Sequence, residues 1–422
     1  MRNLFLGIFL FAGIPAISQT AWTWTELDTM PIPISNNAVT GATVFSAPAA
    51  YSFGGIDTTK MWSGITKRSF RYDVTGDSWE EIAPLPTTLP LIAASASQVQ
   101  NMIYIIGGYN VDSGGGEISS DEVIIYNPET NSYEANGTPI PVPIDDQVQC
   151  VWRDSLIYVI TGWSNTGNVP NVQIYDPALD SWSVGTEVTD DNDFKAFGGS
   201  GEIIGDTIYY FGGASMGWNF PARKELRKGV IDPVDPTQIS WTLEEDGPNQ
   251  GYRQACMKHS NNVYWLGGSS VSYNYNGVAY NGSGGVEPLT QIMRYDSDTE
   301  IWYAGEGAPY SVMDLRGVAQ IGPTSWIICG GMKEGQEVSN RTFRLDFDPV
   351  VGGISESETD IKVVNRMILS SVELKEIELY SMDGKRVQQI EPEDAILPEE
   401  LKGIFILKCT SVFGTSTLKV AL

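Results

Sequence analysis

Short apolar runs that end in paired glycines recur along most of the chain. Each run alternates or stacks hydrophobic and aromatic side chains over about five residues, as in a buried β-strand. The runs begin at Tyr51, Tyr104, Tyr158, Tyr209, Tyr264 and Ile327. Their fourth positions, Gly54, Gly107, Thr161, Gly212, Gly267 and Gly330, are 53, 54, 51, 55 and 63 residues apart. A repeat of this length predicts blades of β-sheet around an axis.

Each repeat contains the pattern of four antiparallel strands. In the second unit the pattern predicts strands over 91–99, 102–106 and 122–126 and a fourth beginning at residue 132, with a turn at Gln100-Asn101. The paired glycines allow a backbone conformation and a close approach that a side chain would block. Six such units fill about residues 21–349.

The order Tyr-x-x-Gly-Gly, then Tyr-Asp-Pro, then Trp resembles the kelch repeat. The resemblance covers most of 21–349 and implies a kelch-type β-propeller, which the count of six units makes six-bladed. Short alternating segments with tight turns in the tail predict a small C-terminal β-sandwich, so the expected fold class is all-β. Three units depart from the pattern, since Thr161 replaces a glycine, Tyr133 replaces a tryptophan, and Ile231-Asp232 lacks the tyrosine.

The sixth unit lacks an outer strand of its own. Near the N-terminus, Trp24 to Leu27 followed by Pro31 matches the outer-strand segment that begins at Trp79. We therefore expect residues 21–28 to complete the last blade, because this pairing joins the ends of the ring and covers an exposed edge.

Both ends of the chain carry patterns outside the repeat. Residues 1–18 have a basic start, a short apolar run and a small-residue exit, which is typical of a secretory signal peptide. The predicted domains are thus a signal peptide (1–18), the propeller (19–349), a linker (350–360) and a β-sandwich (361–422), with no transmembrane segment.

Three segments of the tail resemble the type A C-terminal sorting domain of the type IX secretion system. They are 377–387, 397–408 and the ending 417–420, although the Asn-Pro element that opens such domains is absent. The resemblance implies export through the periplasm of a Gram-negative bacterium to the outer-membrane surface or the medium, with the secretion machinery as a partner.

The overall charge narrows the range of partners. With 52 acidic and 26 basic side chains the formal charge is −26, which excludes nucleic acid as a probable ligand. We expect a monomer.

Small residues stand eleven positions before the fourth position of each run: Thr43, Ala96, Cys150, Gly201, Cys256 and Ala319. This placement near the axis favours buried thiols over disulfides.

Ligands of propellers usually bind on the axial face, formed by loops entering the innermost strands and loops leaving the second strands. The candidate ligand-binding residues on this face are Arg253, Arg316, Asp146, Asp193, Lys195, Trp163, Trp218 and Tyr273. Arg253 and Arg316 each stand fourteen residues before the first glycine of their repeat, at Gly267 and Gly330. This shared position, or station, in neighbouring blades could let the two side chains bind one carboxylate together. The alternative is that they pair with Asp146, Asp193 or Asp314.

The longest loop, 269–291, holds Tyr273, Tyr275 and Tyr280, which suits stacking on sugars or gripping a peptide, or else marks an insertion without a ligand. The acidic run 190–193 raises calcium as an option, but a solvated loop is favoured, and no metal or cofactor is predicted. A single histidine, His259, does not supply the paired ligands of a copper oxidase.

These features predict a secreted or cell-surface module that binds a glycan or a protein. The competing hypothesis is an enzyme resembling the sialic acid mutarotase, a sugar epimerase or mutarotase acting on an acidic sugar through an arginine and a carboxylate in the axial pocket. We identify no catalytic residue from the sequence, and an enzyme is the less favoured of the two.

Overall fold

The computed structural model describes residues 21–348, 361–364, 367–370, 374–381, 385–390, 396–397, 401–402, 404–411 and 414–421. The expected signal peptide (1–18) and linker (350–360) lie outside these residues. The described chain forms two compact units, Ala21–Asp348 and a C-terminal unit beyond it.

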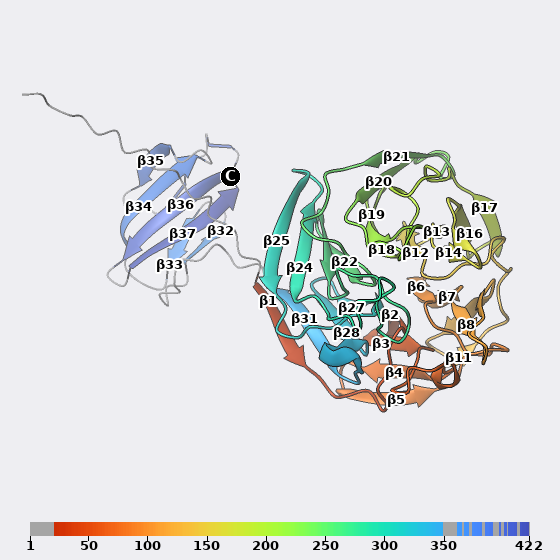
Figure 1. Ribbon diagram of the computed structural model, residues 1–422. Helices are drawn as coiled ribbons and strands as arrows, with labels where there is room; N and C mark the ends of the chain where they lie inside the picture. The colour runs from red at the N-terminus through yellow and green to blue at the C-terminus, as the bar shows by residue number, and fades with distance from the viewer. Residues whose placement is uncertain are drawn as a thin grey trace, which may run out of the picture. The chain divides into compact units, whose positions relative to one another are not determined.

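Six four-stranded antiparallel sheets radiate from one axis in the first unit, which confirms the predicted propeller (Figure 1). Blades 1 to 3 are built from β2 (Ala38–Val44), β3 (Ala47–Phe53), β4 (Ser69–Asp73) and β5 (Ser78–Ile82); β6 (Ser95–Val99), β7 (Met102–Ile106), β10 (Val123–Asn127) and β11 (Ser132–Tyr133); and β12 (Val148–Trp152), β13 (Leu156–Ile160), β16 (Val172–Asp176) and β17 (Ser181–Val184).

Blades 4 to 6 follow the same order from the axis outward. Their strands are β18 (Phe197–Ile204), β19 (Thr207–Ala214), β20 (Leu226–Ile231) and β21 (Ile239–Leu243); β22 (Ala255–His259), β23 (Asn262–Leu266), β24 (Gln291–Asp296) and β25 (Ile301–Gly307); and β27 (Ala319–Gly322), β28 (Ser325–Cys329), β31 (Thr342–Asp348) and β1 (Ala21–Glu26).

The remaining elements of the propeller are short and lie in its loops, except for β26 (Arg316–Gly317), which pairs in parallel with β2. They are the strand pairs β8 (Tyr109–Val111) with β9 (Glu117–Ser119), β14 (Trp163–Ser164) with β15 (Gly167–Asn168) and β29 (Met332–Lys333) with β30 (Glu337–Val338), and the 3₁₀ turns η1 (Trp62–Gly64) and η2 (Glu334–Gln336).

The paired glycines connect each blade to the next one. In the second pair, Gly107 and Gly108 have φ values of 70° and 88°, which side chains rarely adopt. A Cβ atom on Gly107 would lie 2.3 Å from the carbonyl oxygen of Ile144 in blade 3, and the Gly108 amide donates a 2.9 Å hydrogen bond to that oxygen. The repeated glycines are therefore contacts between blades as well as strand ends.

Strands from the two ends of the propeller close the ring, as predicted. β1 pairs with β31 in antiparallel register from Ala21 opposite Asp348 to Glu26 opposite Phe343, and the two strands lie side by side in Figure 1. The Trp22 ring packs edge-on against Tyr264 of blade 5, with ring centroids 5.2 Å apart. The last blade is thus completed by residues 21–26, which precede the first blade in the chain.

Aromatic and aliphatic side chains fill the spaces between adjacent blades. Tyr51 and Phe53 of blade 1 pack on Tyr126 of blade 2 with centroids 5.5 and 5.6 Å apart. All four cysteines, Cys150, Cys256, Cys329 and Cys409, are free and buried, which confirms the preference for thiols over disulfides.

The C-terminal unit is also built from strands. A four-stranded sheet has the order β35 (Arg386–Ile390), β34 (Leu374–Ser381), β36 (Ile404–Ser411) and β37 (Gly414–Ala421), and a hairpin joins β32 (Ile361–Val364) to β33 (Met367–Ser370). Ile368 of the hairpin packs with Ile377 and Leu407 of the sheet in one apolar cluster. The tail therefore has its own small core.

Candidate functional site

A ring of six backbone hydrogen bonds surrounds the propeller axis where the chain enters the innermost strands. Each bond joins one blade to its neighbour, with N···O distances of 2.7–3.4 Å. The bonds run from the amides of Asn36, Ala93, Asp146, Gly198, Arg253 and Leu315 to the carbonyls of Asp314, Asn36, Ala93, Asp146, Gly198 and Arg253, respectively. This ring closes the axis on the face that carries the entering and leaving loops.

The ring holds its residues in an unusual backbone conformation. Asn36, Ala93, Asp146, Arg253 and Asp314 all have φ between 49° and 64°, which is disfavoured for residues other than glycine. Because the strain recurs in five blades and each residue is tied to the adjacent blade, we attribute it to ring closure.

Arg253 and Asp146 form a buried ion pair at the centre of this ring. The Arg253 Nε and Nη2 donate to the two Asp146 carboxylate oxygens at 3.1 and 2.6 Å, and Nη1 donates to Asp314 at 2.9 Å. Asp314 also accepts a 2.5 Å bond from the Ser35 hydroxyl. All three charged side chains are at most 3% exposed. The guanidinium is thus paired inside the protein, as in the alternative considered from the sequence.

Arg316 does not occupy the station of Arg253, contrary to the count from the glycines. In the ring, blade 6 supplies the Leu315 amide and the Asp314 carbonyl, where blade 5 supplies both groups from Arg253. A bulge between Gln320 and Gly322 shifts the register of β27 by one residue and accounts for part of this offset. Arg316 still approaches the cluster, with its Nη1 3.6 Å from Asp146 Oδ1. Its Nη2 donates to Ser95 Oγ and to the Gln147 carbonyl at 3.0 and 2.9 Å.

Burial shifts the pKa values of Asp314, Asp145 and Arg316, which surround Arg253. Burial raises the pKa of Asp314 above its usual range, although the Arg253 charge opposes the shift. Burial and then the negative charge of Asp146 hold the pKa of Asp145 well above normal, against a 2.5 Å hydrogen bond from Ser119. Burial also lowers the pKa of Arg316. The sequence had not singled out Ser119, whose partner Asp145 lies 26 residues away in the chain.

The long loop 269–290 covers the ring and presents only part of its aromatic side chains to solvent. Tyr273 is fully buried against Tyr252 and lies 5.5 Å from the Arg253 guanidinium carbon. Tyr280 packs on Phe220 of the blade 4 loop, with centroids 5.0 Å apart. Residues of this loop join apolar clusters with blades 1, 2, 4 and 6. The structure therefore does not present Tyr273 to a ligand, contrary to its place among the candidate ligand-binding residues.

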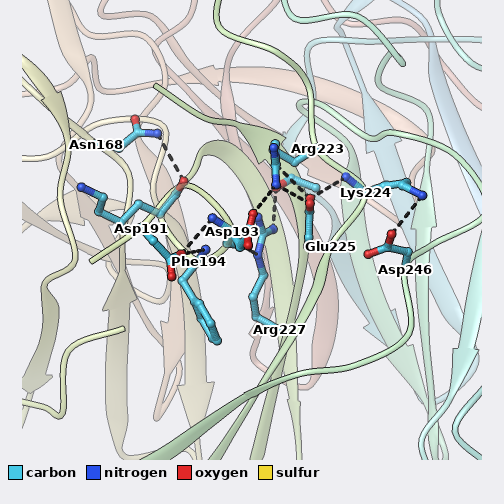
Figure 2. Close-up of polar contacts among 11 residues, drawn as sticks. Asn168, Asp191, Asp193, Phe194, Arg223, Lys224, Glu225, Arg227 and Asp246 are labelled. Atoms are coloured by element: carbon cyan, nitrogen blue, oxygen red, sulfur yellow. Dashed lines mark hydrogen bonds and ion pairs between the residues drawn. The ribbon is translucent and has the colours of Figure 1, made fainter. Parts of the chain in front are cut away.

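The remaining acidic and basic candidates lie on the rim, in salt bridges. Asp193 accepts a 2.6 Å bond from Arg223, which also pairs with Glu225, as Figure 2 shows. Lys195 pairs with Asp190 at 2.5 Å. The acidic run 190–193 is therefore partly neutralised by neighbouring cations. No group of three or more potential metal ligands occurs among the described residues.

A buried arginine lies below this rim. The Arg227 Nε donates to the Asp193 carbonyl at 2.6 Å and its Nη1 donates to the Gly212 carbonyl at 2.7 Å (Figure 2). Since Arg227 lies on β20 and Asp193 precedes β18, this side chain ties the rim to the sheet of blade 4.

The two candidate tryptophans have different environments. Trp163 is half-buried, with its ring 5.5 Å from Phe197 and 5.6 Å from Phe220. Trp218 is 91% exposed at the tip of the blade 4 loop. Other apolar side chains are also exposed on loops that leave second strands: Met61, Trp62, Ile118 and Val278. These loops belong to four blades and share one face of the propeller.

A polar cavity of about 440 Å³ lies along the axis on the other side of the ring. Its walls come from the innermost strands of all six blades, and Arg316 and Gln147 line it. The pattern of small residues indicated a crowded axis, but it did not predict this cavity. Its position differs from the loop face on which we expected a ligand site.

Comparison with known proteins places this architecture in a class. Residues 91–135 match the family model of the kelch motif. Kelch-like protein 25 of Xenopus tropicalis is 23% identical over 261 residues, which cover 60% of this chain and 38% of that protein. Beta-scruin of Limulus polyphemus is 27% identical over 165 residues, covering 37% and 17%, respectively.

A solved structure supports the same fold. The structure of YjhT is similar with a TM-score of 0.60 at 14% identity, and the match covers 82% of this chain and 99% of that one. The kelch-motif match and these relatives support a kelch-repeat protein, and the solved structure shows the β-propeller fold. The chain spans less than half the length of the Xenopus and Limulus relatives. In the described part of the chain, no helix is long and apolar enough to cross a membrane.

Proposed function

We propose that this protein is a binding module that contacts a partner protein through the loop face of its propeller. The observation that carries the proposal is the set of exposed apolar side chains, above all Trp62 and Trp218, on loops around a sealed centre. Exposed tryptophans contribute strongly when buried at protein interfaces. A closed centre favours contact with an extended surface over enclosure of a small substrate.

The test compares the Trp62→Ala/Trp218→Ala variant with Val234→Ala, which removes an exposed side chain from a turn between the third and fourth strands of blade 4. Crosslinking with purified surface proteins of the source cells, followed by titration of the captured partner, should show a loss of binding of at least about tenfold in the double variant only. Equal binding by both variants would reject this face. A glycan array with the same proteins tests the glycan alternative.

The enzyme hypothesis gains no support from the loop face. Transfer of protons to a sugar would need an arginine and a carboxylate that reach the substrate. Arg253 and Asp146 instead bind each other and are shielded by the loop 269–290. An NMR exchange assay with common acidic sugars would reveal anomer interconversion if this activity exists.

We propose further that the C-terminal unit directs export through the type IX secretion system and that the propeller works at the cell surface or in the medium. Support comes from the sorting-domain resemblance and from the separate core of this unit. Deletion of 361–422 in the source organism should leave the propeller in the periplasm, as measured by immunoblotting of cell fractions. Normal secretion of the truncated protein would refute this role.

A further inference from the structure

The axial cavity has one blocked end and one accessible end. The backbone ring with its Arg253 cluster blocks the end near the long loop. At the other end, a second hollow lined by the turn residues Asp154, Gly205 and Ser260 shares Lys258 and Gln320 with the cavity wall. The volume of about 440 Å³ is in the range of small-ligand sites.

The cavity wall is rich in hydroxyl and amide groups. Such side chains are contributed by Thr40, Thr43, Ser95, Ser97, Gln98, Gln147, Gln149, Ser200, Gln254 and Gln320. The charged groups of the wall have partners within the protein: Lys258 lies 3.1 Å from Glu202, and Arg316 lies 3.6 Å from Asp146. An uncharged ligand with many hydroxyl groups therefore suits this wall better than an ion.

Two buried polar atoms of the wall residues have no hydrogen-bond partner among the described residues. They are a donor, Arg316 Nε, and an acceptor, Gln147 Oε1. The two residues are 6% and 1% exposed, respectively.

An aromatic ring stands at the accessible end. Phe45 is 79% exposed at the turn between β2 and β3, whose flanking residues Thr43 and Pro48 line the cavity. Its φ of 47° is an outlier for a bulky side chain, and this conformation suits asparagine or glycine much better. A strained, exposed aromatic residue beside a polar cavity points to a role in binding, because aromatic faces pack on the apolar faces of sugar rings.

We propose that this cavity, with Phe45 at its rim, binds a small uncharged polyhydroxylated molecule of the sugar class. The site lies on the opposite side of the ring from the loop face assigned to a protein partner. Hydroxyl groups of the ligand bond to the hydroxyl and amide side chains of the wall, while the Phe45 ring packs on a pyranose face.

The first test separates binding from stability with Phe45→Asn. Asparagine tolerates the left-handed turn, so the melting temperature should stay equal or rise. Saturation-transfer NMR and calorimetry with glucose, galactose, N-acetylglucosamine and maltose should detect at least one sugar, with affinity reduced about fivefold or more in the variant. Trp218→Ala, on the loop face, should bind that sugar like the wild type, which separates this site from the proposed protein-binding face.

The second test locates the ligand with the native thiols. Cys150 and Cys256 line the cavity, whereas Cys329 and Cys409 are buried elsewhere. The bound sugar should slow modification of the first two by methyl methanethiosulfonate and leave the other two unchanged, as measured by peptide mass spectrometry. Absence of binding by every sugar, unchanged affinity in Phe45→Asn, or equal protection of all four thiols would overturn the proposal.

Discussion

Among the described ion pairs, Arg253 supplies the nearest positive charge to Asp146 and Asp314, at 2.6 and 2.9 Å. Arg316 lies 3.6 Å from Asp146. Replacing Arg253 by methionine would leave these buried carboxylates without that countercharge. We expect Arg253→Met to lower the free energy of unfolding by about 3–5 kcal/mol in urea titrations. The exposed pair Arg68–Glu81 is the matched control, where Arg68→Met should cost less than about 1 kcal/mol. Equal losses would contradict the central role of Arg253.

The stability of the fold depends on pH through the carboxyl group of Asp145. Its pKa is raised in the folded state by burial and by Asp146, so its contribution to stability is present at low pH and is lost as pH rises through the folded pKa. Asp145→Asn keeps an acceptor for Ser119 without the charge. Its melting temperature should match the wild type near pH 4 and exceed it increasingly toward pH 8, by differential scanning fluorimetry. No such gain is expected for Asp112→Asn, whose carboxylate accepts backbone bonds on the surface.

At the scale of elements, β1 closes the propeller with few residues. Trp22 packs on Tyr264, Trp326 and Phe347, with centroids 5.1–5.8 Å apart. Trp22→Ala should lower the free energy of unfolding by about 3 kcal/mol.

Deleting 20–30 should lower the melting temperature much further, because the edge of β31 is then unpaired. Trp218→Ala, which removes an exposed ring, should melt like the wild type; an unchanged melt of the deletion variant would rule out closure by β1.

The strand order was predictable because each element carries a local signal. The apolar run 102–106 became β7 with the same bounds, and the predicted turn residues Gln100 and Asn101 have φ of 46° and 65°. The departure at Thr161 is also local: it adopts φ of 45°, and its hydroxyl accepts a hydrogen bond from the Ala196 amide. Periodicity and turn chemistry therefore determine the blades.

The site was less predictable because it depends on distances between blades. Blade 6 places Asp314 and Leu315, and not Arg316, at the ring position of Arg253, and no count along the sequence reveals that shift. Likewise, the residue types of the loop 269–290 suggested contact with a ligand, but its tyrosines belong to apolar clusters with residues of other blades. Residue type identified the polar and aromatic side chains near the axis. Only the closed ring shows which of these side chains are already paired with each other.

At the scale of the whole molecule, the propeller has two unlike faces. On the loop face, the backbone ring, the Arg253 cluster and the loop 269–290 seal the axis, while Trp62 and Trp218 remain exposed. On the other side, a polar cavity extends toward the turns of the innermost strands. One chain can therefore offer an apolar surface for a macromolecule and a polar pocket for a small molecule, without competition between the two.

The division of the chain after Asp348 gives the last prediction. The propeller forms one compact unit over Ala21–Asp348, and β31 is the last strand that the ring requires. A chain of residues 19–348 should therefore unfold cooperatively, within about 2 °C of the propeller transition in the full chain, by differential scanning calorimetry. A chain of residues 19–340 is the matched control: it lacks β31, so β1 has no partner and the ring cannot close. A large loss of stability in the 19–348 chain would mean that the tail supports the propeller, and a native melt of the 19–340 chain would mean that closure contributes little.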